Sequence, residues 1–167
     1  MVMKTLVAAP LTKDAFAPYG EVIEKSGSES FLINNGKCRR HHALARVDVT
    51  GEGAEVIVSL FSGTPYALPH TVELVERHPL GSQAFYPLGQ NNWLVIVCSD
   101  ADGIPVNPQA FVASSAQGVN LKRGVWHGVL TPLYQPSDFL VVDRGGQGDN
   151  LEEIHLADDQ KFQVVLV

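Results

Sequence analysis

Turn-forming residues recur along this chain at such short intervals that only short segments fit between them. Its 167 residues include 15 glycines and 10 prolines, and the segments between them are rich in β-branched and aromatic side chains. Such segments favour strands, and many short strands at this spacing are typical of a β-sandwich or a small β-barrel. The sequence therefore predicts an all-β fold.

The predicted elements are one short helix near the N-terminus and a series of strands. Thr12 is suited to cap the helix, and Pro18-Tyr19-Gly20 to end it. Asn35-Gly36 is a strong hairpin-turn signal, and residues 100–108 read as a polar loop with two prolines. The predicted strands are residues 21–25, 31–34, 45–49, 56–61, 72–76, 84–86, 93–98, 110–113, 119–121, 139–142 and 164–167.

Length and charge limit what the chain can be. A length of 167 residues suits one domain, residues 1–167. The net charge of -6 provides no electrostatic footprint for nucleic acid or an anionic membrane, and no stretch approaches the roughly 20 apolar residues of a membrane helix. Two cysteines, Cys38 and Cys98, are too few for a disulfide framework, and the first apolar run is too short for a signal peptide. We therefore expect a cytoplasmic protein with reduced thiols, whose partner is a small molecule.

Two stretches, residues 76–89 and 118–127, concentrate the side chains that can do chemistry. Glu76 and His78 are two residues apart, so on a strand their side chains share one face. Gln83 begins the next predicted strand, and His127 follows a glycine-containing turn. We expect these four side chains to converge in the interior of a barrel.

The first stretch is similar to the first sequence motif of cupin barrels, which reads His-x-His, then Glu, then Gly. Glu76 stands at the first histidine, His78 matches the second, Gln83 replaces the motif's glutamate, and Gly89 matches the closing glycine. The resemblance implies a cupin-type antiparallel β-barrel (jelly roll) with a short N-terminal helix.

The second stretch is similar to the second cupin motif, Pro-x-Gly-x-x-His. Gly124 and His127 match it, and Arg123 stands where proline is usual. Beyond the motifs, the ordered runs at residues 33–36, 76–81, 83–85, 117–120, 125–127 and 139–146 resemble the ureidoglycolate lyase family, and the likeness covers about residues 4–155. It implies cleavage of ureidoglycolate to glyoxylate and urea in allantoin (purine) breakdown, by a homodimer.

The resemblance also implies roles for individual residues. Glu76, His78 and His127 are the candidates for the catalytic acid and base, and which is which stays open because protonation depends on the pocket. Gln83 can hydrogen-bond the ureido carbonyl, since an amide both donates and accepts. A histidine can instead serve packing alone, although convergence of these four polar groups is hard to explain by packing.

The substrate's carboxylate requires a cation. Arg144, Arg40 and Lys122 are the candidates, in falling order, because guanidinium groups bind carboxylates in a two-pronged way. The alternatives are that Arg144 belongs to a solvated turn and that Arg40 belongs to an exposed basic patch with His41 and His42.

A metal is the remaining question. Two histidines and a carboxylate can hold Fe(II), Ni(II) or Mn(II), so Glu76, His78, Gln83 and His127 form a candidate metal site. Neutral Gln83 in place of an anionic ligand weakens that site, and we expect no strictly required cofactor but stimulation by a divalent ion such as Ni2+. The alternatives to the lyase are a metal-dependent cupin oxygenase or isomerase and a non-catalytic cupin that binds a small metabolite.

Overall fold

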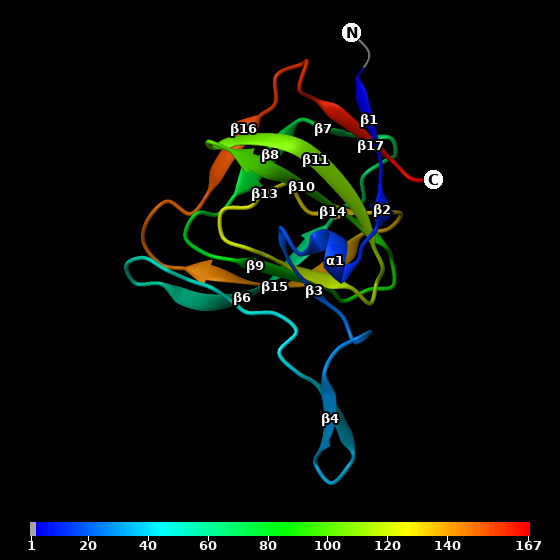
Figure 1. The fold of residues 1–167 in the computed structure, drawn as a ribbon, viewed down its shortest axis with the longest axis vertical. Coiled ribbons are helices and arrows are strands. Elements are labelled where there is room, and N and C mark those ends of the chain that lie inside the picture. Colours follow the sequence, from blue (N-terminus) through cyan, green and yellow to red (C-terminus); the bar gives the residue numbers. More distant parts are fainter. Residues whose placement is uncertain (1–2) are drawn as a thin grey trace.

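Two β-sheets face each other and enclose an apolar interior, as Figure 1 shows for the computed structural model, which describes residues 3–167. The first sheet has the order β3 (Gly20–Ile23), β12 (Gly118–Leu121), β9 (Gln83–Pro87), β15 (Ser137–Gly145) and β6 (Glu55–Gly63). The second has the order β16 (Glu152–His155), β8 (Leu74–Arg77), β13 (Trp126–His127), β10 (Trp93–Ala101), β11 (Ile104–Ala113) and β2 (Ala9–Pro10), with β14 (Thr131–Pro132) beside β10.

Antiparallel pairing dominates both sheets, and the predicted all-β fold of antiparallel strands is confirmed. Parallel pairs occur where the chain ends meet the barrel: β2 pairs with β11, and β1 (Lys4–Val7) with β17 (Phe162–Val165). The predicted N-terminal helix is α1 (Lys13–Phe16), where Thr12 Oγ1 accepts a hydrogen bond from the Ala15 amide at 3.2 Å. Among residues 3–167, no helix has the length and apolar character needed to cross a membrane.

The apolar core lies in two layers, one on each side of the second sheet. Between the two sheets, Val95 and Val97 of β10 pack with Phe85 and Val141 of the first sheet. Behind the second sheet, Val75 and Trp126 pack under a small sheet made of β1, β17 and β7 (His70–Val72). Successive side chains of a strand point to opposite faces of the sheet. A residue that packs in one of these core layers therefore also shows which way its neighbours on the strand point.

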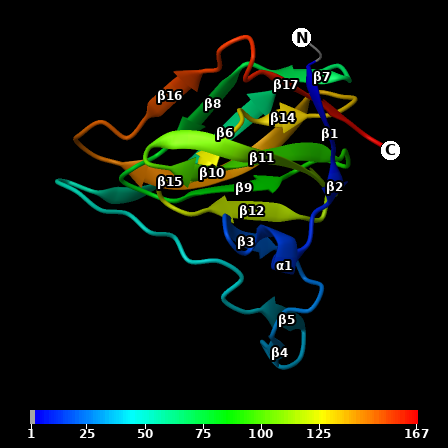
Figure 2. The ribbon, with the colours of Figure 1, turned by 45° about the horizontal axis from the view of Figure 1, so that its top comes forward.

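A hairpin of β4 (Ser30–Ile33) and β5 (Cys38–His41) extends away from the barrel (Figures 1 and 2). Its turn contains Asn34, Asn35 and Gly36, all with positive φ, as the Asn-Gly signal predicted. Asparagine and glycine tolerate this left-handed conformation, so the turn residues set the register of the hairpin.

The predicted strand at residues 45–49 is wrong, since only Val49 makes an isolated bridge, to Gly81. Side chains bind some of the backbone groups that a neighbouring strand would otherwise pair with. The amide of Asn120 donates to the Arg46 carbonyl at 2.9 Å, and Ser82 Oγ accepts from the Asp48 amide at 2.8 Å. Alternating apolar residues were therefore not enough to make a strand.

The predicted polar loop at residues 100–108 is also wrong. β10 and β11 form one long hairpin that turns at Asp102 and Gly103, both with positive φ. Pro108 lies at the register shift between the strands, where a bulge removes the need for an amide donor. The two prolines are thus accommodated inside a strand.

Candidate active site

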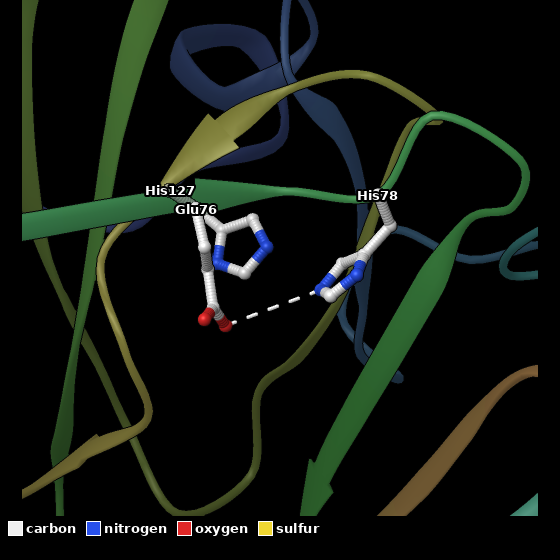
Figure 3. Close-up of side chains that lie close together, drawn as sticks. All are labelled: Glu76, His78 and His127. Atoms are coloured by element: carbon white, nitrogen blue, oxygen red, sulfur yellow. Dashed lines mark ion pairs between the residues drawn. The ribbon is translucent and has the colours of Figure 1, made fainter. Parts of the chain in front are cut away.

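Glu76, His78 and His127 come together, and Figure 3 shows their side chains close to one another. Each offers a ligand-type atom, and these atoms all lie within 4.8 Å of one another. Glu76 of β8 pairs directly with His127 of β13. Their neighbours Val75 and Trp126 belong to the outer layer, so Glu76 and His127 face the interior.

Both imidazoles are held in one tautomer by the backbone. His78 Nδ1 lies 2.8 Å from the Asn150 carbonyl oxygen, and His127 Nδ1 lies 2.9 Å from that of Gly128. A carbonyl only accepts, so each Nδ1 carries a hydrogen, and Nε2 is the atom with the lone pair in the neutral ring. Both Nε2 atoms are buried and have no hydrogen-bond partner in the protein. Two imidazole lone pairs therefore face the site, ready for a proton, a ligand or a metal ion.

Burial changes the proton affinity of two of these groups. Desolvation lowers the pKa of His127 to about 4, opposed by its hydrogen bond to Gly128 and assisted by His78. Desolvation also raises the pKa of Glu76, with His78 opposing and Glu153 adding to the shift. Glu76 Oε1 lies 4.0 Å from His78 Nε2. Near neutral pH His127 is therefore an uncharged acceptor, and Glu76 is a stronger base than an exposed glutamate.

Gln83 faces the same interior from the opposite sheet. Its cross-strand neighbour Leu121 and its alternate neighbour Phe85 line a small cavity together with His127. Gln83 Nε2 donates to Asp143 Oδ2 at 3.1 Å. Gln83 Oε1 and Asp143 Oδ1 are both buried without a partner. The interior thus presents two further unpaired acceptors.

Arg144 lies on the other face of its strand. Phe139 and Val141 point into the core, so Asp143 points inward and Arg144 outward. The Arg144 guanidinium donates to the carbonyls of Thr50 at 2.6 Å and Gln147 at 2.6 Å. In this arrangement it ties two loops together, and its role as a carboxylate partner stays a prediction.

The structure does not bring Lys122 or Arg40 to Glu76, His78 and His127 either. Lys122 Nζ donates to the Ala17 carbonyl at 2.7 Å beside the N-terminal helix. Arg40 lies on β5 of the protruding hairpin, with its guanidinium 6.0 Å from the centre of the Phe31 ring. Both therefore remain untested as substrate-binding residues.

Asp143 is the site residue that the sequence reasoning missed. The signal was present in the alternation of the run 139–145, because Phe139 and Val141 mark the inward face two and four residues before it. Arginine is the better partner for a substrate carboxylate, so the sequence favoured Arg144 over Asp143 beside it.

The whole chain can now be compared with known proteins. Residues 3–164 match the ureidoglycolate lyase family. The chain belongs to this family. A ureidoglycolate lyase of Chelativorans sp. (strain BNC1) is 59% identical over 90% of this chain and 92% of its own length. Those of Mesorhizobium japonicum and Rhizobium meliloti (ureidoglycolate lyase 2) are 52% and 54% identical, over 93% and 90% of this chain and 95% and 93% of their own lengths.

Within this member of the ureidoglycolate lyase family, Glu76, His78 and His127 fit a divalent metal ion. Two imidazole nitrogens and one carboxylate are a donor set that Ni(II) and Fe(II) accept. The Nδ1 hydrogen bonds to backbone carbonyls orient both rings, as outer partners commonly do for histidine ligands. The unpartnered Nε2 atoms are the ligand atoms such a site needs.

Proposed function

We propose that this protein cleaves ureidoglycolate to glyoxylate and urea by general acid–base catalysis, as a step in allantoin breakdown. The observation that carries the proposal is the family match over residues 3–164. Relatives named ureidoglycolate lyase align with this chain over nearly their full lengths. Incubating the purified protein with ureidoglycolate and quantifying urea, glyoxylate and ammonia tests it.

The reaction moves one proton between two atoms on the same carbon. The hydroxyl O–H bond breaks, and its electron pair forms the carbonyl of glyoxylate. The carbon–nitrogen bond breaks, and its electron pair goes to the leaving nitrogen, which takes up a proton and leaves as urea. No oxidant, reductant or water is consumed, so a base and an acid are sufficient. Positioned proton transfer of this kind contributes roughly 10²–10⁴-fold.

Glu76 is the base in this proposal. Its raised pKa places it closer to the working pH than an ordinary glutamate, which favours proton transfer in both directions. The carboxylate removes the hydroxyl proton and returns it to the leaving nitrogen, because both atoms are attached to one carbon. His78, whose Nε2 lies 4.0 Å from Glu76 Oε1, opposes the rise in the Glu76 pKa.

His127 serves as a fixed acceptor. With a pKa of about 4, its Nε2 carries no proton to donate near neutral pH, so it is not the acid. Its Nε2 lone pair can accept a hydrogen bond from an N–H of the substrate ureido group, which leaves the hydroxyl proton to Glu76.

A divalent ion such as Ni2+ would be held by Glu76, His78 and His127. When bound, it supplies Lewis acidity that polarises a substrate oxygen. We propose that the ion stimulates the reaction without being required, because acid–base transfer needs only the side chains. With the ion held there, removal of the hydroxyl proton would still be the role of the Glu76 carboxylate.

We also propose a cytoplasmic homodimer. Outward-facing Val56, Val58 and Leu60 on edge strand β6 are 52%, 66% and 68% exposed, and the protruding hairpin exposes Phe31 and Leu32. Contiguous exposed apolar side chains of this kind mark association surfaces. Light scattering after size-exclusion chromatography should give twice the chain mass, and Leu60→Asp should give a monomer.

Ile104 provides the matched control for that variant. It is 55% exposed on β11, away from the β6 edge. Ile104→Asp should stay dimeric. A wild-type chain that elutes at the monomer mass, or a dimer that survives Leu60→Asp, contradicts this interface.

A further inference from the structure

Asp143 and Gln83 form a hydrogen-bonded pair, and both of its unpartnered side-chain atoms are hydrogen-bond acceptors. Gln83 is 6% exposed, and its amide donates to Asp143 Oδ2 at 3.1 Å. A carboxylate oxygen accepting this bond fixes the orientation of the amide, with its NH2 toward Asp143 and its oxygen away. The two remaining atoms, Gln83 Oε1 and Asp143 Oδ1, are buried acceptors with no partner.

Buried acceptors without partners are costly and are normally satisfied by a bound group. The partner that this pair lacks must supply hydrogen-bond donors, as N–H groups do. It must also reach the interior between the two sheets, because Leu121 and Phe85 beside Gln83 belong to the core there.

We propose that Asp143 and Gln83 recognise the ureido group, with Asp143 Oδ1 and Gln83 Oε1 accepting hydrogen bonds from its N–H donors. This inference rests on the proposed function and names the residues that choose the leaving group. A ureido group carries three N–H bonds, so it can satisfy both acceptors at once. The expectation that Gln83 binds the ureido carbonyl changes accordingly, because the free atom of its amide is the oxygen.

The pair also explains selectivity against shorter acids. A ligand with a carboxylate but no ureido group leaves both acceptors unsatisfied. Sites built to hydrogen-bond a group discriminate strongly against analogues that lack it. Asp143 and Gln83 are thus specificity-determining residues, while proton transfer belongs to Glu76.

The test uses two ligands and measures binding by calorimetry. Ureidoacetate keeps the carboxylate and ureido group of the substrate but lacks the hydroxyl, so it cannot be cleaved. Glyoxylate lacks the ureido group. Asp143→Asn turns the free acceptor into an N–H donor and should weaken ureidoacetate at least about 10-fold, leaving glyoxylate within about 2-fold. Gln83→Met, which keeps side-chain length, should weaken ureidoacetate selectively as well.

Equal weakening of both ligands, or no weakening of ureidoacetate, in folded Asp143→Asn and Gln83→Met would overturn the inference. The proposed function is judged separately, by whether the wild-type protein converts ureidoglycolate. If the wild-type enzyme is active but its variants bind ureidoacetate as tightly as the wild type does, only the proposed ureido contacts are rejected. An inactive wild-type protein rejects the lyase whatever the binding data.

Discussion

The rings of His78 and His127 lie with their centroids 5.3 Å apart, and each gives its Nδ1 hydrogen to a backbone carbonyl. The carbonyls come from Asn150 and Gly128, so two separate segments fix the same tautomer. The free ring nitrogens consequently lie close to the carboxylate of Glu76, with His78 Nε2 4.0 Å from Glu76 Oε1. The site is organised before any substrate arrives, which reduces the cost of aligning the reacting groups.

His127→Asn tests the free Nε2. The asparagine amide can still donate to the Gly128 carbonyl in place of Nδ1, but no atom replaces Nε2. We expect kcat/KM for ureidoglycolate to fall at least about 100-fold with the circular dichroism spectrum unchanged. A folded variant that keeps more than a tenth of wild-type kcat/KM would show that His127 only fills space.

The acid limb of the pH profile reports Glu76. The base must be deprotonated, so kcat/KM falls as the pH drops through its pKa. Burial raises that pKa, so the midpoint should lie above the ordinary glutamate value of 4.5. His127, with a pKa of about 4, stays neutral through this range. The profile is measured on chelator-treated enzyme, so that no metal ion competes for the carboxylate.

Glu153 provides an electrostatic control on the same carboxylate. It lies opposite Glu76 on β16, and its charge contributes to the raised pKa. Glu153→Gln should shift the acid limb to lower pH without lowering the maximal rate, whereas Glu153→Asp, which keeps the charge, should leave the limb in place. An acid limb that does not shift in Glu153→Gln would show that a group other than Glu76 sets its midpoint.

Metal stimulation should depend on the same three side chains. Dialysis against a chelator should leave measurable activity, and added Ni2+ should raise it. His78→Asn should abolish the increase, because it removes one of two imidazole ligands. Activity that disappears on chelation and returns only with a stoichiometric metal would make the ion essential and contradict the acid–base account.

The strand period and the two motif stretches were sufficient to predict the barrel and the meeting of Glu76, His78 and His127. Strand pairing was harder to predict, because Asp102 and Gly103 make a tight turn inside what reads as a proline-containing loop. Residues 45–49 alternate like a strand, yet Asn120 and Ser82 bind their backbone. Asp143 was missed because the direction of a strand residue is decided by its packed neighbours, whereas Arg144 was favoured by chemistry alone.

The central claim is tested most directly by the nitrogen product. Purified protein, free of urease, is given ureidoglycolate, and urea, ammonia and glyoxylate are quantified over time, with His127→Asn as the control for uncatalysed decay. The account predicts urea and glyoxylate in equal amounts with no ammonia above that control. Glyoxylate accompanied by ammonia and no urea would contradict it, because that outcome requires water to attack the ureido carbonyl.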